Sequence, residues 1–122
     1  MIVYKSLTTH SRQSGKTTAL IKKAIEMDSL DYRVYFVIHN RNTGFSIGKK
    51  LINSNVKWGT LNTFPSRITP KTNISPEMLL VNTGEIYIFL DEYKLMDQTK
   101  LDHLLNSLTV SKHNFCVIGV ST

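Results

Sequence analysis

Short apolar runs alternate with amphipathic segments along most of this chain. Four of the runs are rich in β-branched or aromatic residues and predict strands, at residues 2–7, 34–38, 86–90 and 115–120. The runs at 34–38 and 86–90 are apolar without interruption, which is typical of central parallel strands covered on both faces. Residues 56–61 predict one further strand.

The segments between the strands carry apolar residues at helical spacing. Residues 15–27 predict a helix with these residues on its buried side: Leu20, Ile21, Ala24, Ile25 and Met27. Residues 97–108 predict a second helix, with leucines at i, i+3, i+4 and i+7 facing the sheet: Leu101, Leu104, Leu105 and Leu108. A short helix is indicated by Ile47, Leu51 and Ile52.

Prolines mark the least periodic part of the chain. Residues 64–75 predict a loop. Ser75 and Pro76 then form the pattern of a helix start, with Gly84 as its end. Strands that alternate with helices predict parallel βα units, and 122 residues suit one α/β domain over residues 1–122. We expect Cys116, Tyr35 and Trp58 to be packing residues.

The net charge of +6 is unevenly distributed. Residues 1–60 hold ten Lys and Arg against three Asp and Glu, whereas residues 61–122 hold five against six. The positive excess suits a nucleic-acid backbone, although a solvated surface explains it equally well. No apolar run is long enough for a membrane span, and the single cysteine fits a reducing compartment. We therefore expect no membrane partner and a cytoplasmic location.

Residues 11–17 read Ser-Arg-Gln-Ser-Gly-Lys-Thr, between a predicted strand and a predicted helix. This pattern is typical of a phosphate-binding loop, in which backbone N–H groups meet an anion at the positive end of a helix. Lys16 would supply charge to the β- and γ-phosphates of ATP, and Thr17 a hydroxyl to Mg²⁺. Nucleotide contacts are expected from the end of the loop: Gln13, Ser14, Gly15, Lys16, Thr17 and Thr18.

Two loop residues change this picture. The usual pattern has a glycine five residues before Gly15, where this chain has His10, which we expect to face solvent. Arg12 lies inside the loop and can reach the transferring phosphoryl oxygens as an arginine finger, which makes it a catalytic candidate beside Lys16. The alternative for Arg12 is a surface arginine or a partner of a carboxylate.

Two adjacent carboxylates, Asp91 and Glu92, follow the strand at 86–90. Ligands of open α/β sheets bind at the carboxyl ends of the strands, so both are placed for a site there. We expect Asp91 to hold the Mg²⁺ shell, through water because Mg²⁺ dehydrates reluctantly. Glu92 is expected to orient and polarise the attacking water. Without the phosphate loop, an exposed turn would explain the pair equally well.

Residues 11–17 resemble the phosphate loop of viral terminase large subunits, the ATPases that package phage DNA. In that family an Arg-Gln pair within the loop and a missing first glycine are familiar. The strand before Asp91 and Glu92 is similar to its second motif, and residues 117–122 resemble its third, coupling motif. The resemblance implies that Asp91 is a metal ligand, that Glu92 is the catalytic carboxylate, and that Ser121 and Thr122 lie beside the γ-phosphate.

The order of elements also resembles helicase-type ATPase cores. It implies a three-layer α/β/α fold with a mainly parallel sheet of the P-loop NTPase (RecA-like) type. Members of these families continue beyond the position of Thr122, so we expect a homo-oligomer, or a partner subunit that completes the sheet. The function expected is an ATP-hydrolysing ATPase acting on DNA, most specifically duplex DNA in viral packaging, with the host cytoplasm as its location.

An alternative of a different class is a nucleotide-binding regulatory or decoy protein that binds an ATPase partner without hydrolysis. A small-molecule kinase fits less well, because residues 64–75 lack the arginine-rich lid that such kinases usually need. A GTPase fits less well again, because the chain has no Asn-Lys-x-Asp motif. His39, His103 and His113 show no spacing typical of a zinc site.

Overall fold

The computed structural model describes residues 1–12, 14–65, 68–70 and 85–122. Within them, parallel strands form one five-stranded sheet in the order β1-β5-β4-β2-β3. The regular elements are β1 (Ile2–Thr9), α1 (Lys16–Ser29), β2 (Arg33–Ile38), α2 (Arg41–Leu51), β3 (Lys57–Thr60), β4 (Ile86–Asp91), α4 (Gln98–Val110) and β5 (Phe115–Ser121). Two short 3₁₀ turns, η1 (Leu61–Thr63) and η2 (Tyr93–Leu95), follow β3 and β4.

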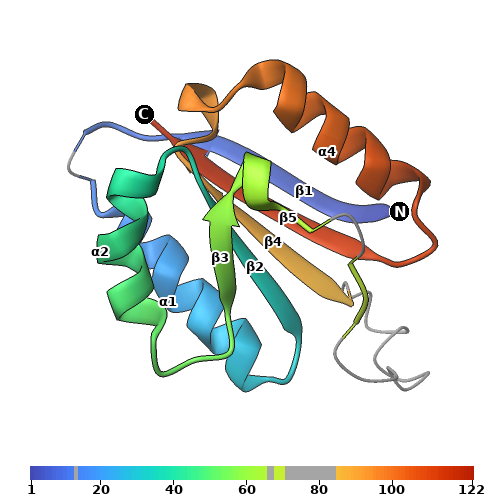
Figure 1. The fold of residues 1–122 in the computed structure, drawn as a ribbon, viewed down its shortest axis with the longest axis horizontal. Coiled ribbons are helices and arrows are strands. Elements are labelled where there is room, and N and C mark those ends of the chain that lie inside the picture. Colours follow the sequence, from blue (N-terminus) through green and yellow to red (C-terminus); the bar gives the residue numbers. More distant parts are fainter. Residues whose placement is uncertain (13, 66–67, 71–84) are drawn as a thin grey trace.

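Helices cover both faces of the sheet. Figure 1 shows α1 and α2 on one side of the strands and α4 on the other. Successive strand residues point to opposite faces, so each central strand contributes to two apolar layers. On β4, Tyr87 and Phe89 pack toward α1, whereas Ile86, Ile88 and Leu90 pack toward α4. The three-layer α/β arrangement with a parallel sheet agrees with the sequence prediction.

The order of the strands sets which ends lie together. β5 comes last in the chain, yet it pairs with both β1 and β4 and therefore separates them. Because all pairings are parallel, the carboxyl ends of β1, β5, β4 and β2 lie along one edge of the sheet. β1 pairs with β5 alone among the described strands, so its other side is an edge of the sheet.

Local chemistry explains where the helices begin. The Asn40 side chain accepts a hydrogen bond from the Thr43 N–H (3.0 Å), and the Asp97 side chain accepts one from the Lys100 N–H (3.1 Å). Each bond caps a helix start, of α2 and α4 respectively. α1 has no side-chain cap and begins instead after Gly15, whose backbone is left-handed.

Several sequence predictions need correction in detail. Ile25 is exposed, because it lies about 40° beyond Ile21 around the axis of α1 and leaves the buried stripe. The strand predicted at 56–61 spans only Lys57–Thr60, since the chain turns into η1 at Leu61. α2 is longer than the short helix expected, because the Asn40 cap starts it early. The helix predicted over 76–84 lies outside the described residues.

The packing expectations hold for Cys116 and Tyr35, which are buried. Trp58 packs against α2 but remains 43% exposed, so its packing is one-sided. In the part of the chain that the structure describes, no helix is long and apolar enough to cross a membrane.

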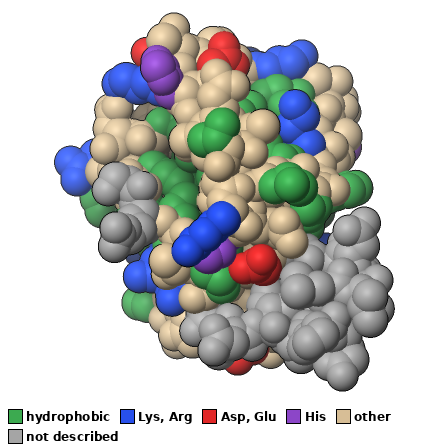
Figure 2. All heavy atoms as spheres, turned by 90° about the vertical axis from the view of Figure 1, so that its right-hand side faces the viewer, with side chains coloured by type: hydrophobic (Ala, Val, Ile, Leu, Met, Phe, Trp, Pro, Cys, Tyr) green, Lys and Arg blue, Asp and Glu red, His purple; other side chains and the backbone are tan. Residues whose placement is uncertain are grey.

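Exposed basic residues are common on the helices of the α1–α2 layer: Lys22, Lys23, Arg41, Lys49 and Lys50. The side of the molecule drawn in Figure 2 lies away from α2, which is on the left in Figure 1. There, Lys and Arg side chains are scattered, with Asp and Glu among them, instead of forming one basic patch.

The buried layer gives a direct test of the fold. Ile88→Val removes one methylene from a fully buried residue of β4, and we expect it to lower the free energy of unfolding by about 1 kcal/mol. The same change at the exposed Ile52 should alter it by less than about 0.5 kcal/mol. Urea unfolding followed by circular dichroism measures both. Equal effects would contradict the burial of Ile88.

Candidate functional site

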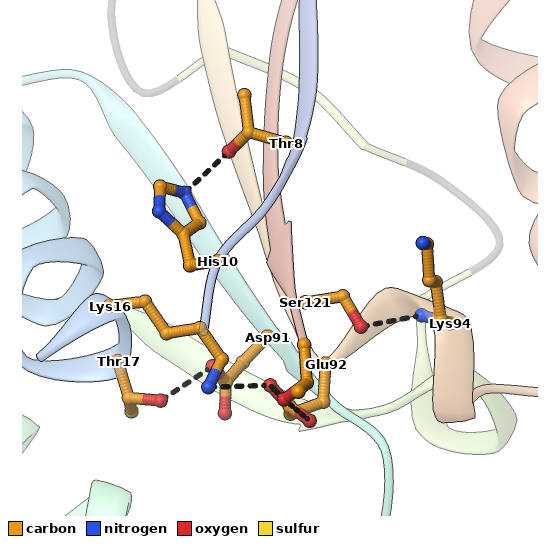
Figure 3. A network of polar contacts seen from close by, with 9 residues as sticks. Thr8, His10, Lys16, Thr17, Asp91, Glu92, Lys94 and Ser121 are labelled. Carbon is orange, nitrogen blue, oxygen red and sulfur yellow. Dashed lines mark hydrogen bonds and ion pairs between the residues drawn. The ribbon is translucent and has the colours of Figure 1, made fainter. Parts of the chain in front are cut away.

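The predicted site residues come from three segments that meet at the carboxyl edge of the sheet. The loop after β1 leads into Lys16 and Thr17, β4 ends at Asp91, and β5 ends at Ser121. Figure 3 shows the Lys16, Thr17 and Asp91 side chains converging between the first turn of α1 and the end of β4, whereas the Ser121 side chain is directed to Lys94. The sheet order therefore brings together residues that are more than seventy positions apart in the chain.

Gly15 sets the direction of the loop into the helix. Its φ of +76° lies in the left-handed region, where residues with a Cβ are strained, although no atom stands within 4 Å of where a Cβ would be. The requirement is thus on backbone conformation and not on space. Since no side chain caps α1, its first N–H groups remain available to an anion at the positive end of the helix dipole.

Asp91 is the buried acid of the site, with an exposed fraction of 1%. The Thr17 Oγ1 hydroxyl donates a hydrogen bond of 2.9 Å to Asp91 Oδ1. Burial raises the pKa of the Asp91 carboxyl, and the neighbouring Glu92 charge raises it further. The Thr17 hydrogen bond and the charges of His39 and Lys16 act in the opposite direction on that pKa. Two oxygens suited to Mg²⁺ thus lie within contact of one another.

Glu92 turns away from the strand and meets Lys16. Its backbone is left-handed (φ 55°), which is uncommon for a residue other than glycine. Glu92 Oε1 lies 3.2 Å from Lys16 Nζ, and the two side chains are only 16% and 11% exposed. Thr122 Oγ1 donates to Glu92 at 3.4 Å from Oε1 and 3.3 Å from Oε2. The carboxylate is therefore held between the loop lysine and the end of β5.

Ser121 links the parts of the site through its backbone and its side chain. Its carbonyl accepts a hydrogen bond from the His10 N–H (2.8 Å), at the start of the loop. Its hydroxyl oxygen accepts one from the Lys94 N–H (3.3 Å), in η2. Ser121 is buried, so we find it supporting the loop and η2.

The remaining predicted residues that the structure describes lie on the surface. Arg12, Ser14 and Thr18 are exposed, and Gln13 falls outside the described residues. His10 is exposed, as expected, and a hydrogen bond of 2.8 Å joins its Nε2 to Thr8 Oγ1. Figure 3 shows the His10 ring directed to Thr8 and away from the two carboxylates.

His39 belongs to the surroundings of the site, although sequence reasoning considered it only as a zinc ligand. It follows β2 directly, next to the end of β4, and its charge lowers the pKa of Asp91. Its Nε2 lies 2.8 Å from the Asn40 side-chain nitrogen, while its Nδ1 is buried without a hydrogen-bond partner. Its position just after the apolar run 34–38, at the same sheet edge as Asp91, was the signal available in the sequence.

Among the described residues, no group of three or more His, Cys, Asp or Glu gathers as metal ligands. A Mg²⁺ ion bound with a triphosphate does not need such a cluster, because water and phosphate oxygens supply most of its ligands. No family model, curated protein or solved structure matches this chain.

The raised pKa of Asp91 predicts how stability depends on pH. A carboxyl whose pKa is raised by folding favours the folded state only while it is protonated, and this contribution is lost as the pH rises through the raised pKa. Asp91→Asn removes the cost of the buried charge. Without nucleotide or Mg²⁺, we expect this variant to be more stable than the unmodified protein at pH 8, by a margin that shrinks toward pH 4.

Thermal unfolding midpoints across that pH range measure the margin. Asp102→Asn, at an exposed position of α4, is the matched control and should change stability little at any pH. A margin for Asp91→Asn that is the same at both ends of the range would contradict the pKa shift.

Proposed function

We propose that this chain is a P-loop ATPase that binds Mg-ATP at the carboxyl edge of its sheet and hydrolyses it while acting on DNA. One observation carries the proposal. The Thr17–Asp91 hydrogen bond and the Lys16–Glu92 ion pair place the last residues of the phosphate-loop pattern against both acids of the strand pattern. Either pattern alone is common, but their meeting in space is what a Mg-triphosphate site requires.

The chemistry assigned to each residue follows from its position. The uncapped N–H groups at the start of α1 would bind the β- and γ-phosphates, with Lys16 as the counter-charge. Thr17 and Asp91 would hold Mg²⁺, which neutralises developing charge on the phosphate oxygens. Glu92 would accept the proton of a water that attacks the γ-phosphorus. The bond from that phosphorus to the bridging oxygen then breaks, giving ADP and inorganic phosphate.

The Lys16–Glu92 ion pair adds a step to this scheme. A bound triphosphate competes with Glu92 for the Lys16 ammonium, since its oxygens carry more negative charge than one carboxylate. Release from Lys16 would leave the Glu92 carboxylate held by Thr122 alone among its described polar contacts. The base would thus become free to bind water when the phosphates arrive. In this proposal Arg12 approaches the γ-phosphate from the exposed side of the loop.

The sheet order supports a particular class of ATPase. β5 lies between the strand that leads into the loop and the strand that bears the acids. This is the arrangement of the additional-strand, catalytic-glutamate class, to which terminase-like packaging motors belong. Thr122, at the end of the inserted strand, touches Glu92. These features favour water activation over transfer to a small acceptor, and a terminase-like viral motor is the most specific form of the proposal.

Nucleic acid is the proposed partner because residues 1–60 carry a positive excess, to which α2 contributes Arg41, Lys49 and Lys50 without an acidic residue. β1 has an edge that is unpaired within the described residues, so a second copy or a partner subunit could extend the sheet there. The competing function is a nucleotide-binding regulator that never hydrolyses ATP. Measurements of turnover and of binding separate the two.

The first experiment concerns the catalytic base. We expect Glu92→Gln to retain ATP binding, because the phosphate contacts remain, and to lose about 100-fold or more of the turnover. Phosphate release and nucleotide binding by calorimetry measure both quantities. Glu26→Gln, the same change on the exposed face of α1, should leave turnover unchanged. Normal turnover in Glu92→Gln would remove Glu92 from the mechanism.

The second experiment concerns DNA. We expect DNA to raise the rate of phosphate release, and the affinity for DNA to fall steeply between 50 and 200 mM salt because counterions are displaced. Lys16→Ala should lose ATP binding and keep DNA binding. A protein that binds ATP without turnover at any protein or DNA concentration would favour the regulator. Absence of DNA binding at low salt would remove DNA from the proposal.

A further inference from the structure

The indole ring of Trp58 packs directly against α2, over two glycines of that helix. A Cβ built on Gly44 would stand 2.8 Å from Trp58 Cζ3, and one on Gly48 would stand 2.4 Å from Cζ2. These distances are too short for any side chain, so the six-membered ring of the indole lies directly against the helix backbone. Because the residue is still 43% exposed, the ring is fixed on one side and open to solvent elsewhere.

Two more apolar side chains are exposed beside this ring. Phe45 is 70% exposed and Ile52 is 76% exposed. Gly48 stands three residues after Phe45 and four before Ile52, so all three positions are neighbours on the helix surface. Trp58, seated over Gly48, therefore joins Phe45 and Ile52 in one surface, which we call the α2–β3 patch.

Basic side chains of α2 flank the patch. Arg41, Phe45 and Lys49 follow one another at intervals of four along α2, so the two cations flank the aromatic ring. The chain contains no Asp or Glu between Asp31 and Glu77. One carboxylate lies near the end of α2, since Asp28 Oδ2 of α1 accepts a hydrogen bond from the Asn55 N–H (3.0 Å). The α2–β3 patch thus combines exposed aromatic side chains with the positive charges of Arg41 and Lys49.

This combination discriminates among possible partners. A second copy docked through the same patch would bring like charges together, because a two-fold interface pairs each surface with itself. A duplex presents phosphates but keeps its base faces stacked inside. A single strand presents both phosphates and free base faces, and aromatic rings beside basic side chains are the usual means of binding it.

We propose that the α2–β3 patch binds single-stranded nucleic acid, with bases stacked on Trp58 and Phe45 and phosphates on Arg41 and Lys49. The inference names a surface for the nucleic-acid part of the proposed function and rests on that part alone, with a single strand in place of the duplex on which the packaging form of that function would act. It does not depend on ATP hydrolysis. α2 begins two residues after His39, at the edge of the sheet that carries Asp91. The bound nucleic-acid strand would therefore run along α2 from that edge.

Trp58 provides the measurement, because it is the only tryptophan of the chain. We expect a fifteen-residue oligothymidine to quench its fluorescence saturably at 50 mM salt, and added salt to reverse the quenching. A blunt duplex of the same length should bind more weakly and quench less. Lys16→Ala should quench as the unmodified protein does, so loss of the ATPase and loss of this binding are separable.

Matched variants then locate the binding. Phe45→Ala truncates an exposed ring and should weaken binding of the oligonucleotide about tenfold. Val110→Ala, which truncates an exposed apolar residue of α4, should leave it unchanged. Lys49→Glu should reduce affinity much more than Lys112→Glu, an exposed lysine after α4. Unchanged unfolding midpoints confirm that each variant is folded.

Four results would overturn the proposal. The first is equal affinity for single strand and duplex, and the second is equal weakening by Phe45→Ala and Val110→Ala. The third is a fluorescence change that follows protein concentration alone with a doubling of mass in sedimentation, which would assign the α2–β3 patch to a second copy. The fourth is equal quenching by polyglutamate, which would assign it to an acidic protein partner.

Discussion

A carboxylate buried at the end of the central strand constrains everything around it. β4 is covered on both faces along its whole length, so Asp91 is buried together with the rest of the strand. Such a group is stable only with a hydrogen-bond donor or a positive charge beside it. The first turn of α1 supplies both, through the Thr17 hydroxyl and the Lys16 ammonium.

The end of β5 connects the other parts of the site to one another. Ser121 holds the start of the loop through its carbonyl and η2 through its hydroxyl, and Thr122 holds Glu92. These contacts come from two consecutive residues, so the loop, η2 and the Glu92 carboxylate are all held at the end of the same strand. A strand placed between the loop strand and the acidic strand is well suited to this role, because it touches both along their whole length.

Much of this arrangement followed from the sequence. Continuous apolar runs located β2, β4 and β5, and helical spacing located α1 and α4. The loop pattern placed Lys16 and Thr17 correctly at a helix start, since its spacing is local. What could not be predicted depends on contacts between distant segments. Periodicity does not show that Glu92 adopts a left-handed backbone and pairs with Lys16, or that His39 lies near Asp91.

The packing of Trp58 on Gly44 and Gly48 could not be predicted either, because it depends on how α2 is positioned against β3. Two glycines in a helix cost stability when considered alone, since each leaves more freedom in the unfolded chain. Here close neighbours leave no room for a side chain: a Cβ at Gly48 would meet the Trp58 indole, and a Cβ at Gly44 would meet both Ile38 and the indole. Homologous chains should therefore keep Gly44, Gly48 and Trp58 together or replace them together. That co-variation gives a fingerprint for identifying distant relatives of this chain.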